Sequence, residues 1–512
     1  MSDRIPPVLR PEHPSARSLA GLVSEFELEH RGSLDGVEVT GITLRSNEVQ
    51  PGDLFVGVPG AVAHGASFAV DARESGAVAL LTDAGGAELA ADSGLPVILV
   101  DSPRAALGAV SAWVYQTNVH PPLTLGVTGT NGKTSTSYIL EGILKQLGLV
   151  TGLSTTAERH IGELSVVSRL TTPEASEIHG LLARMRESEV RAVVLEVSAQ
   201  ALSRNRVDGI DFDIVAFTNL SHDHLDDYAD MEEYFEAKLV FFDPDRARRG
   251  VVSLDSPWGE RIVSASRIPV TTVTSVEGAD AEWRVEILDE TAAYTSFRLT
   301  GPENRSIETS VPLIGRHMAA NAAVAIVMLV EAGFELEAIG HAIQGGIDAY
   351  LPGRTERVSG DRGPAVFVDF GHSPDAFLNT LTAVRTFTTG RVIMLFGADG
   401  DRDATKRHEM GRVASEHSDI LVITDHHPRF EDPASIRRTL IEGAALAEHQ
   451  AELHEVSPPE DAIRFTVSLA QEGDSILWAG PGHQDYRDIR GVRTPYSARA
   501  LARDALRDAG WA

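Results

Sequence analysis

The chain contains no cysteine among its 512 residues. A disulfide framework and thiolate chemistry are therefore excluded, and any metal must be held by oxygen or nitrogen ligands. Basic side chains are also scarce, because 45 lysines and arginines stand against 74 aspartates and glutamates, for a net charge of -29. A protein that binds the nucleic-acid backbone needs a basic face, so we expect no nucleic-acid partner. We interpret the acidity as a solvated surface that aids solubility.

Long hydrophobic runs are missing as well. The longest apolar stretch, around residues 318–330, contains Asn321. A membrane helix needs about 20 apolar residues, and this stretch is shorter, so we predict a buried helix there. Residues 1–21 contain no apolar segment typical of a secretory signal. We therefore expect a cytoplasmic protein without membrane contact.

The length and the order of apolar runs predict three α/β domains. Residues 1–115 are expected to form a small α/β domain, with strands at 53–58, 77–83 and 95–101. The two prolines of NVHPP, residues 118–122, indicate a break after it.

Residues 116–349 and 350–512 are expected to form two further domains. In the first, strand-like runs such as AVVLEVS, DIVAFTN and RGVVSLD alternate with helical stretches, which predicts a parallel sheet wrapped by helices. In the second, AVFVDF, RVIMLFGA, DILVITD and SILWAG predict a doubly wound, Rossmann-like sheet.

The strongest local pattern is GVTGTNGKTST, residues 126–136, between an apolar strand and an amphipathic run. Glycines let backbone N–H groups converge on phosphate oxygens, and the following helix offers its positive N-terminal end. Lys133 supplies a mobile charge and Thr134 can bind Mg²⁺. Five residues, not the four of the ordinary Walker motif, separate Gly126 from Gly132. We predict a variant phosphate-binding loop.

This variant loop resembles that of the ATP-dependent amino-acid ligases of the Mur and folylpolyglutamate family. Two later segments extend the resemblance: LEVSAQAL (195–202) is similar to the family's E-V-S-S-H-A-L, and FTNLSHDHLDDY (217–228) to its T-N-L-x-x-D-H-L-D. Polar residues at strand ends are often merely hydrogen-bonded, but their order after the phosphate loop favours function. The resemblance implies that Glu196 and His224 bind Mg²⁺.

Lys238 lies in MEEYFEAKLVFF (231–242), where the alternative is an ordinary lysine on an amphipathic helix. At the matching place the family has a lysine carbamylated by CO₂, which turns an ammonium into a carboxylate. Mg²⁺ prefers oxygen ligands, and the carbamate forms only on an uncharged amine. The resemblance thus implies two Mg²⁺ ions, held by Thr134, Glu196, His224 and carbamylated Lys238.

The family's reaction implies two steps. A substrate carboxylate attacks the γ-phosphate of ATP to give an acyl phosphate, and an amine then displaces phosphate. Lys133 and Arg354, the latter in PGRTERV, would stabilise the transferring group, and a site shared by two domains implies closure. The residues expected at ATP are Gly129, Thr130, Asn131, Gly132, Lys133, Thr134, Ser135, Asn219, Asn321, Arg354 and Asp369, with His372 in the segment that closes on the nucleotide.

The segment TLRSNEVQPGDLFVGVPGAVAHGASF (43–68) resembles the D-S-R-x-V-x-P-G-D-L-F-V-A-x-P-G segment of the tripeptide-forming Mur ligases, and folylpolyglutamate synthases lack this domain. It implies UDP-N-acetylmuramoyl-L-alanyl-D-glutamate as the acceptor in cell-wall peptidoglycan synthesis. The implied UDP-sugar contacts are Leu44, Ser46, Ala61, Val62 and Ala63. The implied dipeptide contacts are Thr171, Thr172, Ser198, Arg204 and Arg206.

The incoming amino acid is expected to bind the third domain. FGADGDRDATKRHEMG (396–411) resembles the family's F-G-x-G-G-D-R-D-x-x-K-R, so Arg402 and Lys406 are candidates for its carboxylate. The chain has DHHPR (425–429) where diaminopimelate-adding members have D-D-N-P-R, and GPGHQ (480–484) where they have G-K-G-H-E. The candidate amino-acid contacts are Arg402, Lys406, His426, His427, Arg429, Gly480 and Gln484.

The identity of that amino acid stays open. Arg429 could bind a distal carboxylate through two parallel hydrogen bonds, which favours meso-diaminopimelate. Gln484 offers a distal ammonium only a dipole, which keeps L-lysine, L-ornithine and diaminobutyrate as alternatives. A further departure is Gln200, where the family usually has histidine.

The sequence disfavours three other functions. A sister ligase that adds D-Ala-D-Ala would lack GDRDATKR together with DHHPR, and a non-catalytic scaffold would lack Lys133, Glu196, His224 or Lys238. A generic P-loop motor would have the ordinary Walker spacing. The expected partners are the UDP-muramoyl dipeptide, ATP and a diamino acid, and the chain is expected to be a monomer.

Overall fold

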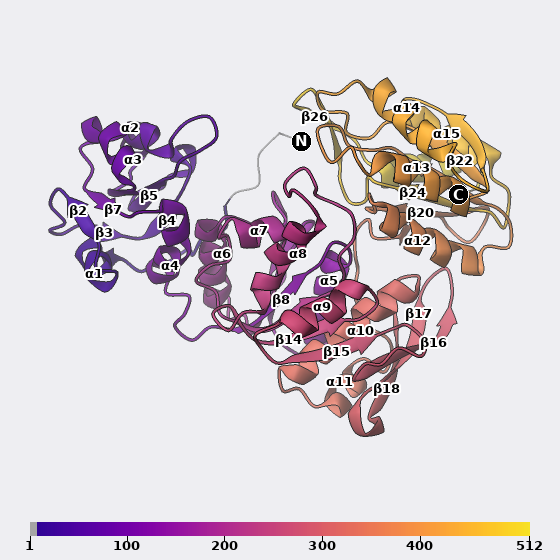
Figure 1. Ribbon diagram of the computed structural model, residues 1–512, viewed down its shortest axis with the longest axis horizontal. Helices are drawn as coiled ribbons and strands as arrows, with labels where there is room; N and C mark the ends of the chain where they lie inside the picture. The colour runs from indigo at the N-terminus through magenta and orange to yellow at the C-terminus, as the bar shows by residue number, and fades with distance from the viewer. Residues whose placement is uncertain (1–7, 512) are drawn as a thin grey trace.

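Three sheets follow one another along the chain, each covered by helices. The structure is a computed structural model that describes residues 8–511. In Figure 1 the N-terminal unit lies at the left, the central unit below and the C-terminal unit at the upper right. The predicted three-domain α/β class is confirmed. Within the described residues, no helix is both long and apolar enough to span a membrane.

The N-terminal sheet has five strands in the order β2-β7-β6-β5-β4, and only β2 runs antiparallel to its neighbour. Its strands are β2 (Glu29–Arg31), β4 (Gly41–Thr43), β5 (Asp53–Gly57), β6 (Ala79–Thr82) and β7 (Val97–Leu99), and β1 (Arg17–Ser18) pairs separately with β3 (Glu38–Val39). Helices α1 (Leu19–Glu25) and α4 (Pro103–Tyr115) cover one face, and α2 (Ala69–Glu74) and α3 (Ala84–Leu89) cover the other. The three predicted strands are β5, β6 and β7.

The central sheet has eleven strands in the order β11-β10-β9-β12-β8-β13-β14-β15-β16-β17-β18. They are β8 (Leu123–Thr128), β9 (Thr151–Ser154), β10 (Glu158–Ile161), β11 (Leu164–Val167), β12 (Ala192–Glu196), β13 (Phe212–Phe217), β14 (Ala247–Ser253), β15 (Val270–Thr274), β16 (Trp283–Glu290), β17 (Thr295–Thr300) and β18 (Ser306–Val311). The seven adjacent strands β9-β12-β8-β13-β14-β15-β16 are parallel, as predicted. Antiparallel pairs extend both edges, with β10 and β11 at one edge and β17 and β18 at the other.

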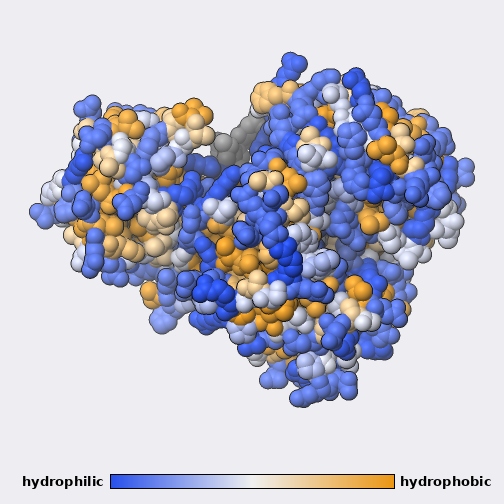
Figure 2. All heavy atoms as spheres, viewed as in Figure 1, coloured by the Kyte–Doolittle hydropathy of each residue, from blue (hydrophilic) through white to orange (hydrophobic). Residues whose placement is uncertain are grey.

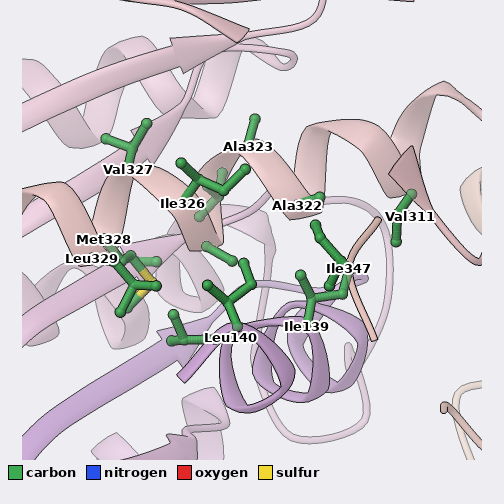
Figure 3. Packing of buried hydrophobic residues seen from close by; sticks show 14 of the residues in the cluster. Ile139, Leu140, Val311, Ala322, Ala323, Ile326, Val327, Met328, Leu329 and Ile347 are labelled. Carbon is green, nitrogen blue, oxygen red and sulfur yellow. The ribbon is translucent and has the colours of Figure 1, made fainter. Parts of the chain in front are cut away.

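Helices cover both faces of the central sheet. One face packs against α5 (Lys133–Gln146), α10 (Arg316–Glu331) and α11 (Leu336–Ala342), and the other against α6 (Ala175–Glu187), α7 (Ala199–Ser203), α8 (Met231–Leu239) and α9 (Pro257–Ala265). Figure 3 shows Ile139 and Leu140 of α5 beside Ala322 and Ile326 of α10, all of them buried. The buried helix predicted around 318–330 is therefore confirmed as α10.

The C-terminal sheet has the order β19-β20-β24-β21-β22-β23, and only β19 is antiparallel. Its strands are β19 (Glu356–Arg357), β20 (Ala365–Asp369), β21 (Val392–Phe396), β22 (Ile420–Ile423), β23 (Glu452–Glu455) and β24 (Ser475–Ala479), beside a hairpin of β25 (Tyr486–Ile489) and β26 (Val492–Pro495). Helices α12 (Pro374–Phe387), α13 (Arg407–His417) and α14 (Pro433–Ala444) cover one face, and α15 (Pro459–Leu469) and α16 (Ala498–Asp508) the other. The four predicted strands are β20, β21, β22 and β24.

Hydrophilic residues dominate the face drawn in Figure 2, in keeping with the net charge of -29. The same view shows a recess between the N-terminal and C-terminal units. Parallel α/β sheets bind ligands beyond the carboxyl ends of their strands. We therefore expect a binding site at the loops after β8, β12, β20 and β21.

Candidate functional site

The phosphate loop joins β8 to α5, and its glycines are required by the space around them. A Cβ on Gly129, whose φ is 151°, would lie 1.9 Å from Thr218 Oγ1. A Cβ on Gly132, whose φ is 86°, would lie 2.6 Å from Asn321 Oδ1. The close approach of Asn321 therefore depends on glycine at 132, and the loop can take its course only with glycine at both positions.

Asn219 fixes the tip of this loop. Its Oδ1 accepts a hydrogen bond from the backbone N–H of Asn131 at 2.9 Å, and its Nδ2 donates to the carbonyl of Asn131 at 3.1 Å. Thr218 Oγ1 donates to the same carbonyl at 2.6 Å. The residues after β13 thus hold the loop in shape, which gives Asn219 a positioning role in the structure.

A cavity of about 320 Å³ opens beside the loop, between the central and C-terminal units. Seven of the residues expected at ATP line it: Asn131, Gly132, Ser135, Asn219, Asn321, Arg354 and Asp369. Arg316, His317 and Asp375 line it too, and the sequence analysis did not single them out. Arg316 and His317 begin α10, the helix that contains the predicted Asn321, so their place just before it in the sequence was a signal for them.

Two of the predicted catalytic residues, Glu196 and Arg354, meet at Thr134 near the start of α5. Thr134 Oγ1 donates to Glu196 Oε2 at 2.9 Å, and Arg354 Nη2 donates to Thr134 Oγ1 at 3.0 Å. Glu196, at the end of β12, also accepts from the backbone N–H of Thr156 at 2.9 Å. Arg354 follows the central domain in sequence, so this contact reaches the phosphate loop from the start of the C-terminal unit.

Two lysines converge on one carbonyl of the loop. Lys133 Nζ donates to the carbonyl of Gly129 at 3.0 Å, and Lys238 Nζ donates to the same oxygen at 2.9 Å. Lys238 is 1% exposed and its Nζ lies 4.5 Å from the ring centre of Tyr234. Burial, together with the charge of Lys133, holds the pKa of Lys238 well below its usual range. An ammonium there is disfavoured, and the uncharged amine is the nucleophile that CO₂ modification needs.

His224 and Asp223 lie near the two lysines of the phosphate loop. Burial lowers the pKa of His224 to about 4, so its imidazole is neutral near pH 7 and can act as a ligand. Burial would raise the pKa of Asp223, but the cation of Lys406 and the nearby histidines His372 and His224 lower it well below its usual range. Lys406 Nζ lies 2.6 Å from Asp223 Oδ1, and His372 Nε2 lies 3.7 Å from Asp223 Oδ2.

These donors fit Mg²⁺. The cation prefers oxygen, and Glu196 and Thr134 offer a carboxylate and a hydroxyl at the phosphate loop, with the neutral imidazole of His224 nearby. A carbamate on Lys238 would add a second carboxylate in a place where a charged lysine is disfavoured.

The residues predicted to bind the dipeptide gather near the end of β12, apart from one. Thr172 Oγ1 donates to the carbonyl of Glu196 at 2.8 Å and accepts from the backbone N–H of Ser198 at 3.1 Å. Thr171 contacts Thr156, and Arg206 Nη1 donates to the carbonyl of Thr172 at 3.4 Å. Arg204 instead pairs with Asp227 at 2.9 Å and is half exposed.

The residues predicted to bind the UDP-sugar lie in the N-terminal unit. Leu44 and Ser46 adjoin β4, whereas Ala61, Val62 and Ala63 form an exposed loop after β5. Two ion pairs link this unit to the central one near Ser46: Arg169 with Glu48 at 2.6 Å, and Arg45 with Glu177 at 3.8 Å.

The residues predicted to bind the amino acid are only partly brought together. His427 Nδ1 accepts from the backbone N–H of Asp488 at 2.9 Å, so its hydrogen lies on Nε2, which donates to Gln484 Oε1 at 2.7 Å. Arg429 Nη2 lies 3.3 Å from Asp399 Oδ2. His426 Nε2 lies 3.5 Å from Asp399 Oδ1.

Two predicted residues stand apart from this group. Lys406 pairs with Asp223 of the central unit, and Arg402 is exposed without a hydrogen bond or ion pair to the group among residues 8–511. Gly480, with a φ of 112°, follows β24 directly and lies next to His426. Asp399 was not singled out in the sequence, although it lies inside the quoted 396–411 segment.

Comparison with known protein families gives matches in all three units. The Mur ligase family, catalytic domain, matches residues 38–115, the Mur ligase middle domain matches 127–329, and the Mur ligase glutamate ligase domain matches 353–482. Together these matches cover well over half of the chain.

Individual relatives match along the full length. A UDP-N-acetylmuramyl-tripeptide synthetase of Leifsonia xyli is 62% identical, with 100% of both chains covered. A UDP-N-acetylmuramoyl-L-alanyl-D-glutamate--2,6-diaminopimelate ligase of Streptomyces avermitilis is 41% identical, covering 97% of this chain and 98% of the relative. A solved structure of a 2,6-diaminopimelate ligase of the same name has a TM-score of 0.65 and 26% identity, covering 97% of this chain and 100% of that one.

Proposed function

Because the chain belongs to the Mur ligase family of ATP-dependent ligases, we propose that it joins a diamino acid to UDP-N-acetylmuramoyl-L-alanyl-D-glutamate. The product would be a UDP-muramoyl tripeptide for peptidoglycan. Relatives at 62% and 41% identity along the whole chain carry names of this activity.

One observation supports the proposal above the others: residues of two domains enclose the cavity at the phosphate loop. Arg354 Nη2 reaches Thr134 at 3.0 Å, and Asp375 Oδ2 accepts from Asn131 Nδ2 at 3.1 Å. Phosphoryl transfer depends on positioning and on neutralising charge, and an enclosed site strengthens both. ATP in this cavity would lie against Lys133 and Arg354.

Each residue then has a role in the two steps. Lys133 and Arg354 balance the charge of the phosphoryl group as the D-glutamate carboxylate takes it up, and Thr172, Ser198 and Arg206 orient the dipeptide. Thr134, Glu196, His224 and carbamylated Lys238 would hold Mg²⁺, which when bound supplies positive charge to the phosphate oxygens.

For the amino acid we propose meso-diaminopimelate. Two observations support it: Arg429 places a guanidinium beyond β22, where a distal carboxylate could meet it, and relatives at 41% identity are named as diaminopimelate ligases. L-lysine, L-ornithine and diaminobutyrate are the alternatives that the replacement residues His426, His427 and Gln484 keep open.

The test is phosphate release with ATP, Mg²⁺ and the UDP-muramoyl dipeptide against these four amino acids, in the wild type and in Arg429→Ala. If diaminopimelate is the substrate, Arg429→Ala lowers kcat/KM for diaminopimelate by an amount that corresponds to about 2 to 5 kcal/mol of transition-state free energy. This is the scale for truncating one partner of a buried charge pair, and kcat/KM for lysine should scarcely change. A wild-type preference for lysine, ornithine or diaminobutyrate would contradict the diaminopimelate assignment. Absence of phosphate release with every amino acid would contradict the ligase proposal itself.

A further inference from the structure

Three loops meet at the carboxyl ends of β24, β21 and β22, which are neighbours in the C-terminal sheet. They bring Asp399, His426, His427, Arg429 and Gln484 together. Among these five side chains, Asp399 is the only carboxylate. The motif to which residues 396–411 are similar has glycine at this position, so the acid is a departure of this chain.

The two histidines of the group are both buried. Burial lowers the pKa of His426 to about 3. His427 accepts a hydrogen bond at Nδ1 and donates one from Nε2, as a neutral imidazole does. Both nitrogens of His427 are thereby engaged, which disfavours a transition-metal site made of Asp399 and the two histidines.

Asp399 is ionised and incompletely paired. Burial would raise the pKa of its carboxyl, but His426, His427 and Arg429 lower it. Oδ2 faces Arg429 at 3.3 Å, while Oδ1 accepts no hydrogen bond within the described chain. A shielded carboxylate oxygen without a donor is costly, and about a third of the side chain (32%) still faces solvent. The group therefore lacks one cationic donor that a small ligand can supply.

We propose that Asp399 receives the side-chain ammonium of the incoming diamino acid and so selects for a distal amine. The inference rests on the proposed function. It identifies a carboxylate that Gln484 does not provide. Gln484 accepts a hydrogen bond from His427, whereas Asp399 lies beside Arg429. The Asp399–Arg429 pair offers one anion and one cation, which complements a distal carbon that carries both an ammonium and a carboxylate.

The test compares amino acids that differ only in the distal amine: meso-diaminopimelate with 2-aminopimelate, and L-lysine with L-norleucine. In each pair the ratio of kcat/KM values measures selection for the amine. In the wild type this ratio favours the diamino acid, and in Asp399→Asn we expect it to fall at least about tenfold, mainly through KM for the amino acid.

Two further variants separate recognition from structure. Asp399→Glu keeps the charge and is expected to keep most of the ratio, and Glu472→Gln removes an exposed acid at the opposite end of the sheet and should leave it unchanged. An unchanged ratio in Asp399→Asn overturns the inference while the ligase proposal stands. The inference would also be overturned if the ratio fell equally in Asp399→Asn and Asp399→Glu and KM for ATP rose in both variants. A wild type that uses none of the four amino acids instead contradicts the proposed function.

Discussion

At the scale of single residues, the phosphate loop is organised by one carbonyl. The oxygen of Gly129 accepts hydrogen bonds from both Lys133 and Lys238, so two amines lie close together in a buried place. Like charges at this separation repel strongly when water is excluded, which favours one neutral amine. Lys238 is the more buried of the two, and it is the one whose chemistry changes if CO₂ reacts with it.

Lys238→Ala should abolish most phosphate release, and bicarbonate should restore part of it. Short carboxylic acids such as acetate should also restore part of it, because they return a carboxylate to the space that the carbamate would fill. The measurement is phosphate release against acid concentration, with Lys145→Ala, an exposed lysine of α5, as the control. If Lys238→Ala kept wild-type activity, the side chain of Lys238 would have only a structural role.

Residues within one motif could be predicted from the sequence, and partners between motifs could not. Lys133, Glu196 and Arg354 are recognisable by their neighbours in the chain, and the structure joins them through Thr134 and the loop. The ion pair of Asp223 and Lys406 links residues 183 positions apart. Only the packing of two domains produces it, so a local pattern could not predict it.

At the scale of elements, the parallel strands were predictable and the edge hairpins were not. Continuous apolar runs such as AVVLEVS become fully buried parallel strands, and their composition alone indicates this. Strand β18 alternates exposed, intermediate and buried residues, and β16 does so irregularly around a register shift near Ile287. Half-exposed strands of this kind give a weak signal because their apolar residues do not form a continuous run, so the sequence did not predict the extension of the sheet beyond β15.

A titratable contact joins β10 to α5. His160 Nδ1 lies 2.8 Å from Glu141 Oε2, and its Nε2 lies 3.2 Å from Glu158 Oε2. Burial alone would lower the pKa of His160, but the two carboxylates raise it to about 9. Burial alone would raise the pKa of Glu141, but the hydrogen bond and charge of His160, together with Lys145, lower it.

This contact should make stability depend on pH. The folded pKa of His160 lies above the unfolded value of 6.5, so its contribution is complete below pH 6.5 and is lost as pH rises through about 9. The Glu141 contribution is lost only as pH falls through its own lowered pKa. His160→Gln should therefore cost about 2 to 3 kcal/mol near pH 6 and little above pH 9. Thermal unfolding from pH 5 to 10 measures this, with exposed His341→Gln as control, and a pH-independent difference would contradict it.

At the scale of the whole molecule, the C-terminal unit is docked on the central one through polar contacts around the nucleotide cavity. Asn131 Nδ2 donates to Ser373 and Asp375, and Arg354 reaches Thr134. Contacts between domains of this kind are small and polar, so relative motion is expected during turnover. The Asp223–Lys406 pair differs from the others because both side chains are almost fully shielded, at 6% and 10% exposure.

That pair should govern closure. Lys406→Met removes the cation and leaves the shielded carboxylate of Asp223 with the backbone N–H of His224 and the imidazole of His372 beside it. Losing the cationic partner of a buried charge costs about 3 to 5 kcal/mol. The unpaired carboxylate regains water if the domains separate, so the variant should favour an open arrangement. We expect a larger radius of gyration in solution scattering and a raised KM for ATP.

Adding Asp223→Asn to Lys406→Met removes the unpaired charge and should restore part of the compactness. Lys145→Met, on the surface of α5, should change neither the radius of gyration nor KM for ATP. An unchanged radius of gyration in Lys406→Met, with an unchanged KM for ATP, would mean that the remaining contacts hold the domains together and that the ion pair is dispensable for closure.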